Sequence, residues 1–437
     1  MRYIKKIAGR AKKSGLIIYF ATAAFAVLFI VAGNRIASDG WAGFGGGYDG
    51  DSRTAEARVS AILDVAEWRG DAELYWMADR LITFEAVITG GAERGATVTA
   101  FQHIADYFPA QPGEVAEGER IILIFLPGFL PGETGEWHFL AHARINTVAV
   151  LGAAFALLLI IFGRAKGFNA ILSLGFTCAA IFAVFLPSIL SGRNIYAAAL
   201  SVCVYSVVVT LFILNGVNKK SLAAAAGCLG GVFAAALLTL LTGGALRLTG
   251  MVDREFEMLL FLPTPTGQPI DLNALIFAGL IIGASGAVMD VAVSISSALW
   301  ELKRRAPELP FGALLKSGLN IGRDIMGSMT NTLVLAYIGS SLPVILLLLA
   351  NSDSLADLLN REMVIVELLQ AIIGAVGILL AMPLTALACA AMYSNSNGRG
   401  VDKTGEGGEY FEELAELERL LNNSAPPLPD KDGGAAQ

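Results

Sequence analysis

Residues 276–299 read IFAGLIIGASGAVMDVAVSISSAL, and Asp290 is the only ionisable side chain among them. The run exceeds the roughly 20 residues that an α-helix needs to cross the hydrocarbon core of a bilayer. A charged side chain at such depth costs at least about 2.5 kcal/mol, so it is by default a candidate for moving or sensing an ion. The alternative is a structural role, in which the carboxyl group makes an interhelical hydrogen bond that only holds helices together.

Apolar stretches of similar length recur along the chain and give about eight predicted membrane spans. They lie at residues 16–32, 145–162, 168–190, 195–215, 222–245, 273–299, 328–350 and 365–392. Of the 437 residues, 55% are hydrophobic and only 16% are charged. No single soluble domain combines that balance with repeated apolar runs of this length. We therefore predict an α-helical polytopic membrane protein, with residues 145–392 as a seven-helix membrane domain.

The first span, within a basic N-terminal segment at residues 1–32, has two interpretations. A basic start followed by an apolar run and small residues is also found in cleavable signal peptides. The run is long for that class, and Val31-Ala-Gly-Asn-Arg35 is a poor cleavage site. We therefore favour an uncleaved anchor helix.

Lysine and arginine are distributed unevenly among the loops, which predicts the orientation. The N-terminus is basic, and alternate later loops carry Arg164, Lys166, Lys219, Lys220, Lys303, Arg304, Arg305, Lys316 and Arg323. Cytoplasmic loops hold the excess of such residues. Both termini should therefore be cytoplasmic. Residues 33–144, which are acidic and contain no lysine, should be extracytoplasmic.

The extracytoplasmic segment has the pattern of a small β-rich domain. Alternating and β-branched residues occur at 57–65, 81–88, 96–103 and 120–126. Four or five short strands suggest a small open barrel of the OB type, which binds oligonucleotides or oligosaccharides. Residues 40–50 are a glycine-rich tether. His138 and His142 lack the glutamate of a zinc-protease motif and are interpreted as membrane-interface residues.

The remaining features point away from several functions. Cys178, Cys203, Cys228 and Cys389 lie inside apolar runs with no metal or redox spacing, so we interpret them as packing residues. Residues 393–437 form an acidic cytoplasmic tail, with a predicted helix at 406–423 and a partly disordered end. No nucleophile motif, phosphate-binding loop or metal triad is present, so we expect neither an enzyme nor a cofactor.

Polar residues share one face in each of the last three spans. Steps of three and four place Gly279, Gly283, Gly286, Asp290 and Ser294 on one stripe. The glycines are expected to let a neighbouring helix approach closely. The next two spans carry the remaining candidates, which are Arg323, Asp324, Ser328 and Asn331, then Glu367 and Gln370.

These faces predict a polar route for a small solute or ion. Glu367 and Gln370 would lie near the outer mouth, Asp290 and Asn331 inside, and Asp324 near the inner mouth. The alternative for Arg323 and Asp324 is a pair that positions the end of a helix at the interface, because flanking charges often do so. A structural hydrogen-bond cluster would give the same pattern in a single sequence.

Two long motifs in the spans resemble the YibE/F family of bacterial multi-pass membrane proteins. They are GASGAVMDVAVSISSALWEL at 283–302 and GRDIMGSMTNTLVLAYIGSSL at 322–342. The similarity also includes Arg193-Asn194 and extends over about residues 55–392. The resemblance implies a protein of the bacterial cytoplasmic membrane with an external β-rich domain, and it implies no substrate or activity.

We expect an ion- or proton-coupled transporter or permease, because seven spans after the external domain are more than an anchor needs. The alternative is a membrane-anchored envelope scaffold or assembly factor whose external domain binds a protein or glycan. The expected partners are the lipid bilayer and a small solute or ion. A homo-oligomer is also considered, whereas a nucleic acid is not expected, because the net charge is −7.

Overall fold

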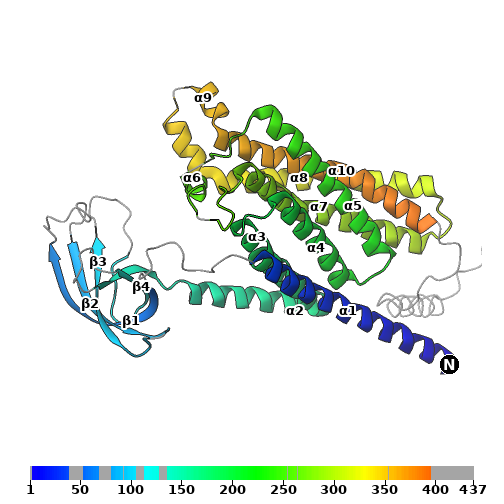
Figure 1. Cartoon of the computed structure of the whole chain (residues 1–437). Helices are drawn as coiled ribbons and strands as arrows, with labels where there is room; N and C mark the ends of the chain where they lie inside the picture. The colour runs from blue at the N-terminus through cyan, green and yellow to red at the C-terminus, as the bar shows by residue number, and fades with distance from the viewer. Residues whose placement is uncertain are drawn as a thin grey trace, which may run out of the picture. The chain divides into compact units, whose positions relative to one another are not determined.

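A computed structural model shows the architecture in two separate units (Figure 1). It describes residues 2–38, 53–67, 80–91, 93–104, 113–126, 135–252, 254–262, 264–352 and 354–394. One unit comprises Met1–Trp41 and Asn169–Gln437, and the other comprises Ala42–Phe168. The predicted glycine tether and the predicted tail helix lie outside the described residues.

The smaller unit contains a closed β-barrel. Its strands are β1 (Arg53–Glu67), β2 (Arg80–Ile88), β3 (Thr97–Ile104), β4 (Arg120–Leu126) and β5 (Glu136–His142). They follow one another around the barrel in the order β1-β2-β3-β5-β4. Every pair is antiparallel except β3 with β5. Alternation decides which side chains face inward, as in β2, where Ile82, Phe84, Ala86 and Ile88 are buried.

Strand β5 carries His138 and His142, which were predicted to be membrane-interface residues. The His138 ring stacks on His103 of β3, with the ring centroids 5.6 Å apart. His142 Nδ1 lies 2.8 Å from a carboxylate oxygen of Glu119. The position of these histidines is therefore set by pairing within the barrel.

Acidification is expected to destabilise the barrel through His103. Burial and the nearby His138 lower the pKa of His103 from 6.5 to about 4. The unfolded chain therefore takes up a proton at a higher pH than the folded one. The resulting destabilisation is absent above pH 6.5, grows as the pH falls, and is complete below about pH 4. Hydrogen exchange of the β3 and β5 amides in the full chain should accelerate over this window.

The variant His103→Gln supplies the control for this pH dependence. It cannot titrate in this range and should reduce the pH dependence, whatever its stability at neutral pH, leaving the part that comes from His138, whose pKa is also lowered by burial. An unchanged profile in this variant would assign the acid sensitivity to other groups.

The larger unit is a helical bundle. Its elements are α1 (Arg2–Ala37), the end of α2 (Ile145–Ala180), the π-helix η1 (Ile181–Phe185), α3 (Leu186–Leu190), α4 (Ile195–Asn215), α5 (Lys219–Leu246), α6 (Arg254–Leu259), α7 (Leu272–Arg305), α8 (Phe311–Ala350), α9 (Leu355–Asn360) and α10 (Glu362–Ser394). Among the residues that the structure describes, seven helices are long and apolar enough to cross a membrane. The chain is thus a multi-pass membrane protein.

The count of seven differs from the predicted eight because residues 145–190 form one helical run of 46 residues. This run is interrupted at Arg164, whose φ of 49° and ψ of −127° are not helical. A Cβ on Gly167 would collide with the carbonyl group of Leu159, eight residues earlier. Residues that far apart are about 12 Å apart along a straight helix. The chain therefore turns back sharply at the Arg164 position.

Helices α5, α7 and α10 pack together at the centre of the bundle through small residues. A Cβ on Gly231 of α5 would lie 2.7 Å from the Cβ of Ala381 and 2.9 Å from both the Gly377 oxygen and Val288. Close packing of this kind holds membrane helices together where lipid is as apolar as the side chains. Three of the four cysteines, Cys203, Cys228 and Cys389, are buried as predicted, whereas Cys178 is exposed.

Helix α1 packs on the same bundle. The Phe29 ring stacks on Tyr205 of α4 at 4.2 Å, and the Tyr205 hydroxyl donates a hydrogen bond to the Ala26 carbonyl. The Ser191 hydroxyl donates to the Ala37 carbonyl at the other end of the contact. These contacts make the predicted anchor helix an integral part of the bundle.

Candidate functional site

The polar stripe on α7 lies on an exposed face of the helix. Gly279, Gly283, Gly286 and Asp290 are all exposed, whereas Ser294 is half-buried. A Cβ on Gly279 or Gly286 would meet no atom within 4 Å, so these glycines do not mark close helix contacts. Among the described residues, none makes a hydrogen bond or ion pair with the Asp290 carboxylate. Asp290 is therefore accessible from outside the packed core of the chain.

Residues of three helices converge at Gly283, two turns from Asp290 along the stripe. A Cβ on Gly283 would lie 3.1 Å from the Tyr337 hydroxyl of α8 and 3.5 Å from Nε2 of Gln370 on α10. Glu367 lies close enough for its charge to act on the Tyr337 hydroxyl. The structure thus groups Glu367 and Gln370 beside the stripe, together with a tyrosine that was not among the predicted site residues.

A cavity of about 260 Å³ lies on the other side of the stripe, between α2, α4 and α7. Most of the lining is apolar, and its polar part comes mainly from hydroxyl groups, after which we call it the hydroxyl-lined cavity: Ser173, Thr177, Ser206, Thr210 and Ser285. A hydroxyl group can both donate and accept hydrogen bonds, so it can contact a small polar solute or a hydrated ion. Gly286 also lines the cavity and lies one helical turn before Asp290 on the same face.

The π-helix η1 borders this hydroxyl-lined cavity through Ile181. Single π turns in helices are frequent at functional sites, because they widen the backbone ladder locally. Pro187 follows directly in α3 and donates no backbone hydrogen bond. The irregular backbone therefore lies where the chain lines a cavity, the position in which membrane proteins tolerate it.

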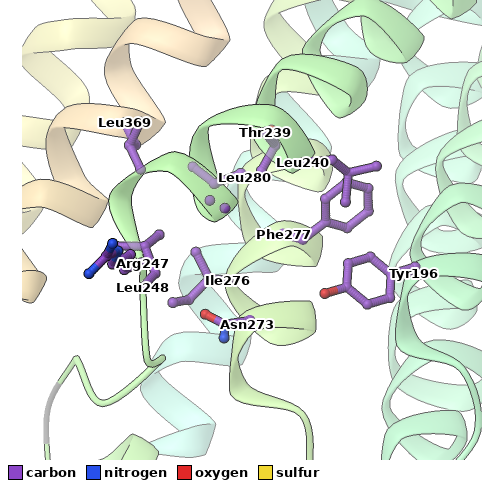
Figure 2. Close-up of a pocket in the computed structure, with 12 residues that line it drawn as sticks. Tyr196, Thr239, Leu240, Arg247, Leu248, Asn273, Ile276, Phe277, Leu280 and Leu369 are labelled. Carbon is purple, nitrogen blue, oxygen red and sulfur yellow. The ribbon is translucent and has the colours of Figure 1, made fainter.

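A second cavity, of about 300 Å³, lies between α4, α5, α7 and α10 (Figure 2). Figure 2 shows Tyr196 and Phe277 on one side and Arg247 on the other, with Asn273 at the α7 end. Most of the lining is apolar. Arg247 has a φ of 50°, a left-handed conformation that ends α5 and is unusual for a residue other than glycine or asparagine.

The loop beside this second cavity is fixed by Glu362 at the start of α10. One carboxylate oxygen of Glu362 accepts hydrogen bonds from the backbone N–H groups of Thr249 at 2.8 Å and Gly250 at 2.6 Å. The other accepts from the Thr249 hydroxyl at 2.7 Å. The end of α5 and the start of α10 are thereby joined next to Arg247.

The predicted site residues of α8 lie on the face opposite its packing contacts. A Cβ on Gly322 would collide with Met382 of α10, and a Cβ on Gly374 of α10 would collide with Leu333 of α8. Gly322 and Leu333 therefore face α10. Asp324 follows Gly322 by two residues, and Asn331 precedes Leu333 by two. Two residues correspond to about 200° around the helix axis, so Asp324 and Asn331 lie on the side away from α10. Arg323, Asp324, Ser328 and Asn331 are all exposed. The structure therefore does not bring them against Asp290 within one chain.

Sequence reasoning missed the hydroxyl groups of the first cavity. Two pairs, Ser173 with Thr177 and Ser206 with Thr210, are spaced four residues apart in their helices. That spacing places each pair on one face, so the pattern could have been found in the sequence. That the two faces meet Ser285 of α7 follows only from the packing of the bundle.

Comparisons with known proteins support one assignment. The family model described as YibE/F-like protein matches residues 151–395, which is more than half of the chain. The match includes the hydroxyl-lined cavity and Asp290 and leaves out the barrel. No curated protein and no solved structure matches the chain.

Proposed function

The chain belongs to the YibE/F-like family, whose description names no activity, and we propose that it is an ion- or proton-coupled transporter or permease of the bacterial cytoplasmic membrane. Asp290 is the proposed coupling carboxylate. The observation that carries this proposal is the position of Asp290, which is exposed and one helical turn from Gly286, a residue that lines the half-open cavity containing the five hydroxyl groups. An intramembrane carboxylate with access to such a cavity has the elements of a cation or proton relay.

The remaining site residues have distinct proposed roles. The hydroxyl groups of Ser173, Thr177, Ser206, Thr210 and Ser285 would hold the ion or a small polar solute. The group of Glu367, Gln370 and Tyr337 beside Gly283 would form the outer gate on the stripe that leads to Asp290. In the second cavity, Arg247 and Asn273 would lie at the entrance from the outer side.

The replacement of Asp290 tests this proposal. In proteoliposomes loaded with a pH-sensitive dye, or with a sodium-sensitive dye, Asp290→Asn and Asp290→Ala should each reduce flux by tenfold or more. Asparagine keeps the shape and hydrogen-bonding capacity of the side chain but not its charge. If Asp290→Asn keeps the wild-type flux and Asp290→Ala only lowers the stability, the carboxylate is a structural group.

We further propose that the lysine-rich end of the bundle faces the cytoplasm and the barrel faces outward. Lys219 Nζ lies 3.4 Å from the Met392 carbonyl oxygen, so the start of α5 lies beside the end of α10. Arg164 lies on the cytoplasmic side with these lysines only if residues 145–190 cross the membrane twice. The chain then crosses the membrane eight times, and both termini are cytoplasmic. An impermeant thiol reagent should label a cysteine at Glu117 of the barrel in intact cells, and labelling only after lysis would reverse the orientation.

The alternative function, an envelope scaffold or assembly factor, depends on the barrel. The five strands of its closed barrel support the predicted OB type, a class that binds oligonucleotides and oligosaccharides. The exposed apolar side chains Leu63, Val65 and Leu140 offer a contact surface for a protein or glycan. A scaffold would keep its activity in Asp290→Asn, which distinguishes it from the transporter.

A further inference from the structure

We propose that the polar face of α8 is an interface with a second copy of this chain, in which Arg323 of each protomer pairs with Asp324 of the other. The polar face consists of the exposed residues Asn320, Arg323, Asp324, Ser328 and Asn331. Among the described residues, none makes an ion pair or hydrogen bond with the side chains of Arg323 and Asp324.

The packing of α8 places this polar face inside the membrane rather than in the cytoplasm. A Cβ on Gly318 would lie 2.8 Å from the Cβ of Ala386 and 2.9 Å from Leu299, the last residue of the apolar run. Gly322 of α8 contacts Met382 of α10. Met382 precedes Met392 by ten residues, and Met392 lies beside Lys219 at the start of α5. Ten residues of helix span about 15 Å. Arg323 and Asp324 therefore lie much further into the membrane than Lys219, and Asn331 lies deeper still.

Lipid cannot cover such a face at low energy. A single unpaired charged residue at the centre of a membrane helix costs about 2.5–3.5 kcal/mol, and an unpaired amide group in hydrocarbon is also unfavourable. The polar groups of membrane helices are therefore turned toward protein or a water-filled cavity. On α8 they point away from α7 and α10, so the partner that covers them must come from outside the described packing of this chain.

A second copy has the required chemistry, whereas the apolar helix at 148–162, among the residues that the structure describes, does not. This stretch, which belongs to the smaller unit, contains only apolar residues and glycine. It offers Arg323 no acceptor. Across a two-fold axis normal to the membrane, the two α8 helices run in the same direction and equal residues lie at equal depth. Adjacent opposite charges on each copy then form two symmetric ion pairs.

The side chains around the charge pair favour close approach of the two helices. Gly327 and Ser328 are exposed, and a Cβ on Gly327 would meet no atom within 4 Å. Small residues allow two membrane helices to contact over their backbones. Beyond Asn331 the exposed face changes to Leu335, Ile338, Leu342 and Leu346, which lipid covers without cost. The proposed interface is thus the inner half of α8.

Disulfide cross-linking tests the position of the interface. The background is Cys178→Ala, because the other three cysteines are buried. In membranes treated with copper phenanthroline, Ser328→Cys should give a cross-linked dimer in most of the protein. The control Leu241→Cys is equally lipid-accessible, with 63% of Leu241 exposed on α5, and should remain monomeric. No dimer from Ser328→Cys, or equal dimer from both, would overturn the proposal.

Charge exchange tests the pairing. Arg323→Asp and Asp324→Arg should each reduce the dimer fraction in mild detergent at least tenfold, because like charges then meet across the axis. The double variant Arg323→Asp/Asp324→Arg restores opposite charges and should dimerise within about twofold of the wild type. Since the double variant carries the same residues in exchanged positions, misfolding cannot produce this recovery. A dimer that withstands both single reversals, or a double variant that stays monomeric, contradicts the pairing.

Discussion

Replacing Gly231 by valine is expected to destabilise the bundle more than any other single substitution considered for this protein. Gly231 lies where α5 crosses α7 and α10, and its added Cβ would be 2.9 Å from the Gly377 backbone oxygen and from Val288. A backbone oxygen cannot move aside as a flexible side chain can. Overpacking of this kind costs about 1–3 kcal/mol or more. The melting temperature of the detergent-solubilised protein should fall by about 5–10 °C.

The matched control is Gly244→Val on the same helix. A Cβ on Gly244 meets no atom within 4 Å, so the substitution tests the effect of a β-branched residue in α5 without the collision. It should change the melting temperature little. If both variants melt at the same temperature, α5 does not cross α7 and α10 as closely as the Gly231 contacts indicate.

Filling the hydroxyl-lined cavity through Gly286→Leu is expected to abolish flux while the fold is kept. Gly286 lines the cavity, and a Cβ there meets no atom within 4 Å, so a leucine has space to enter without displacing the backbone. Its four added carbons would occupy the volume beside Ser285 and replace hydroxyl partners with apolar atoms. Flux in proteoliposomes should fall by tenfold or more, with a melting temperature close to that of the wild type.

Gly279→Leu is the control for this substitution, because Gly279 lies on the same stripe two turns earlier. A Cβ on Gly279 also meets no atom within 4 Å, and Gly279 lines neither of the two cavities. Its flux should stay near the wild-type value. Equal losses in both variants would mean that the whole stripe, rather than the cavity, carries the solute, and retained flux in Gly286→Leu would exclude the cavity from the pathway.

Much of the fold follows from local patterns in the sequence. Apolar runs of membrane length were enough to locate the helices, and alternation located β1 to β4. Strand β5 was not located, because Trp137, Phe139 and Leu140 do not alternate with polar residues as the other strands do. Helix α8 begins at Phe311, well before the predicted seventh span at 328–350. Its first half packs on α7 and α10 through Gly318 and Gly322, contacts that a hydropathy window does not detect.

The candidate site was predictable in its residue types but not in its arrangement. Periodicity correctly places Asp290 with three glycines on one stripe, because a helix fixes the angle between its own residues. It does not fix the rotation of one helix against another. Asp324 and Asn331 share a face of α8 as expected, but that face is turned away from α7, whereas Tyr337 meets Gly283.

The sequence by itself therefore determined that the chain is a multi-pass membrane protein, that a carboxylate lies within one of its spans, and which residues share each helix face. These properties depend on transfer of apolar length from water to lipid and on the fixed geometry of a single helix. Only the tertiary structure decided that hydroxyl groups of α2, α4 and α7 meet in one half-open cavity, one helical turn from Asp290, and that the polar face of α8 is left uncovered. Both depend on the steric fit of helices distant in sequence, which at Gly231 and Gly322 is set by atoms that no local pattern brings together.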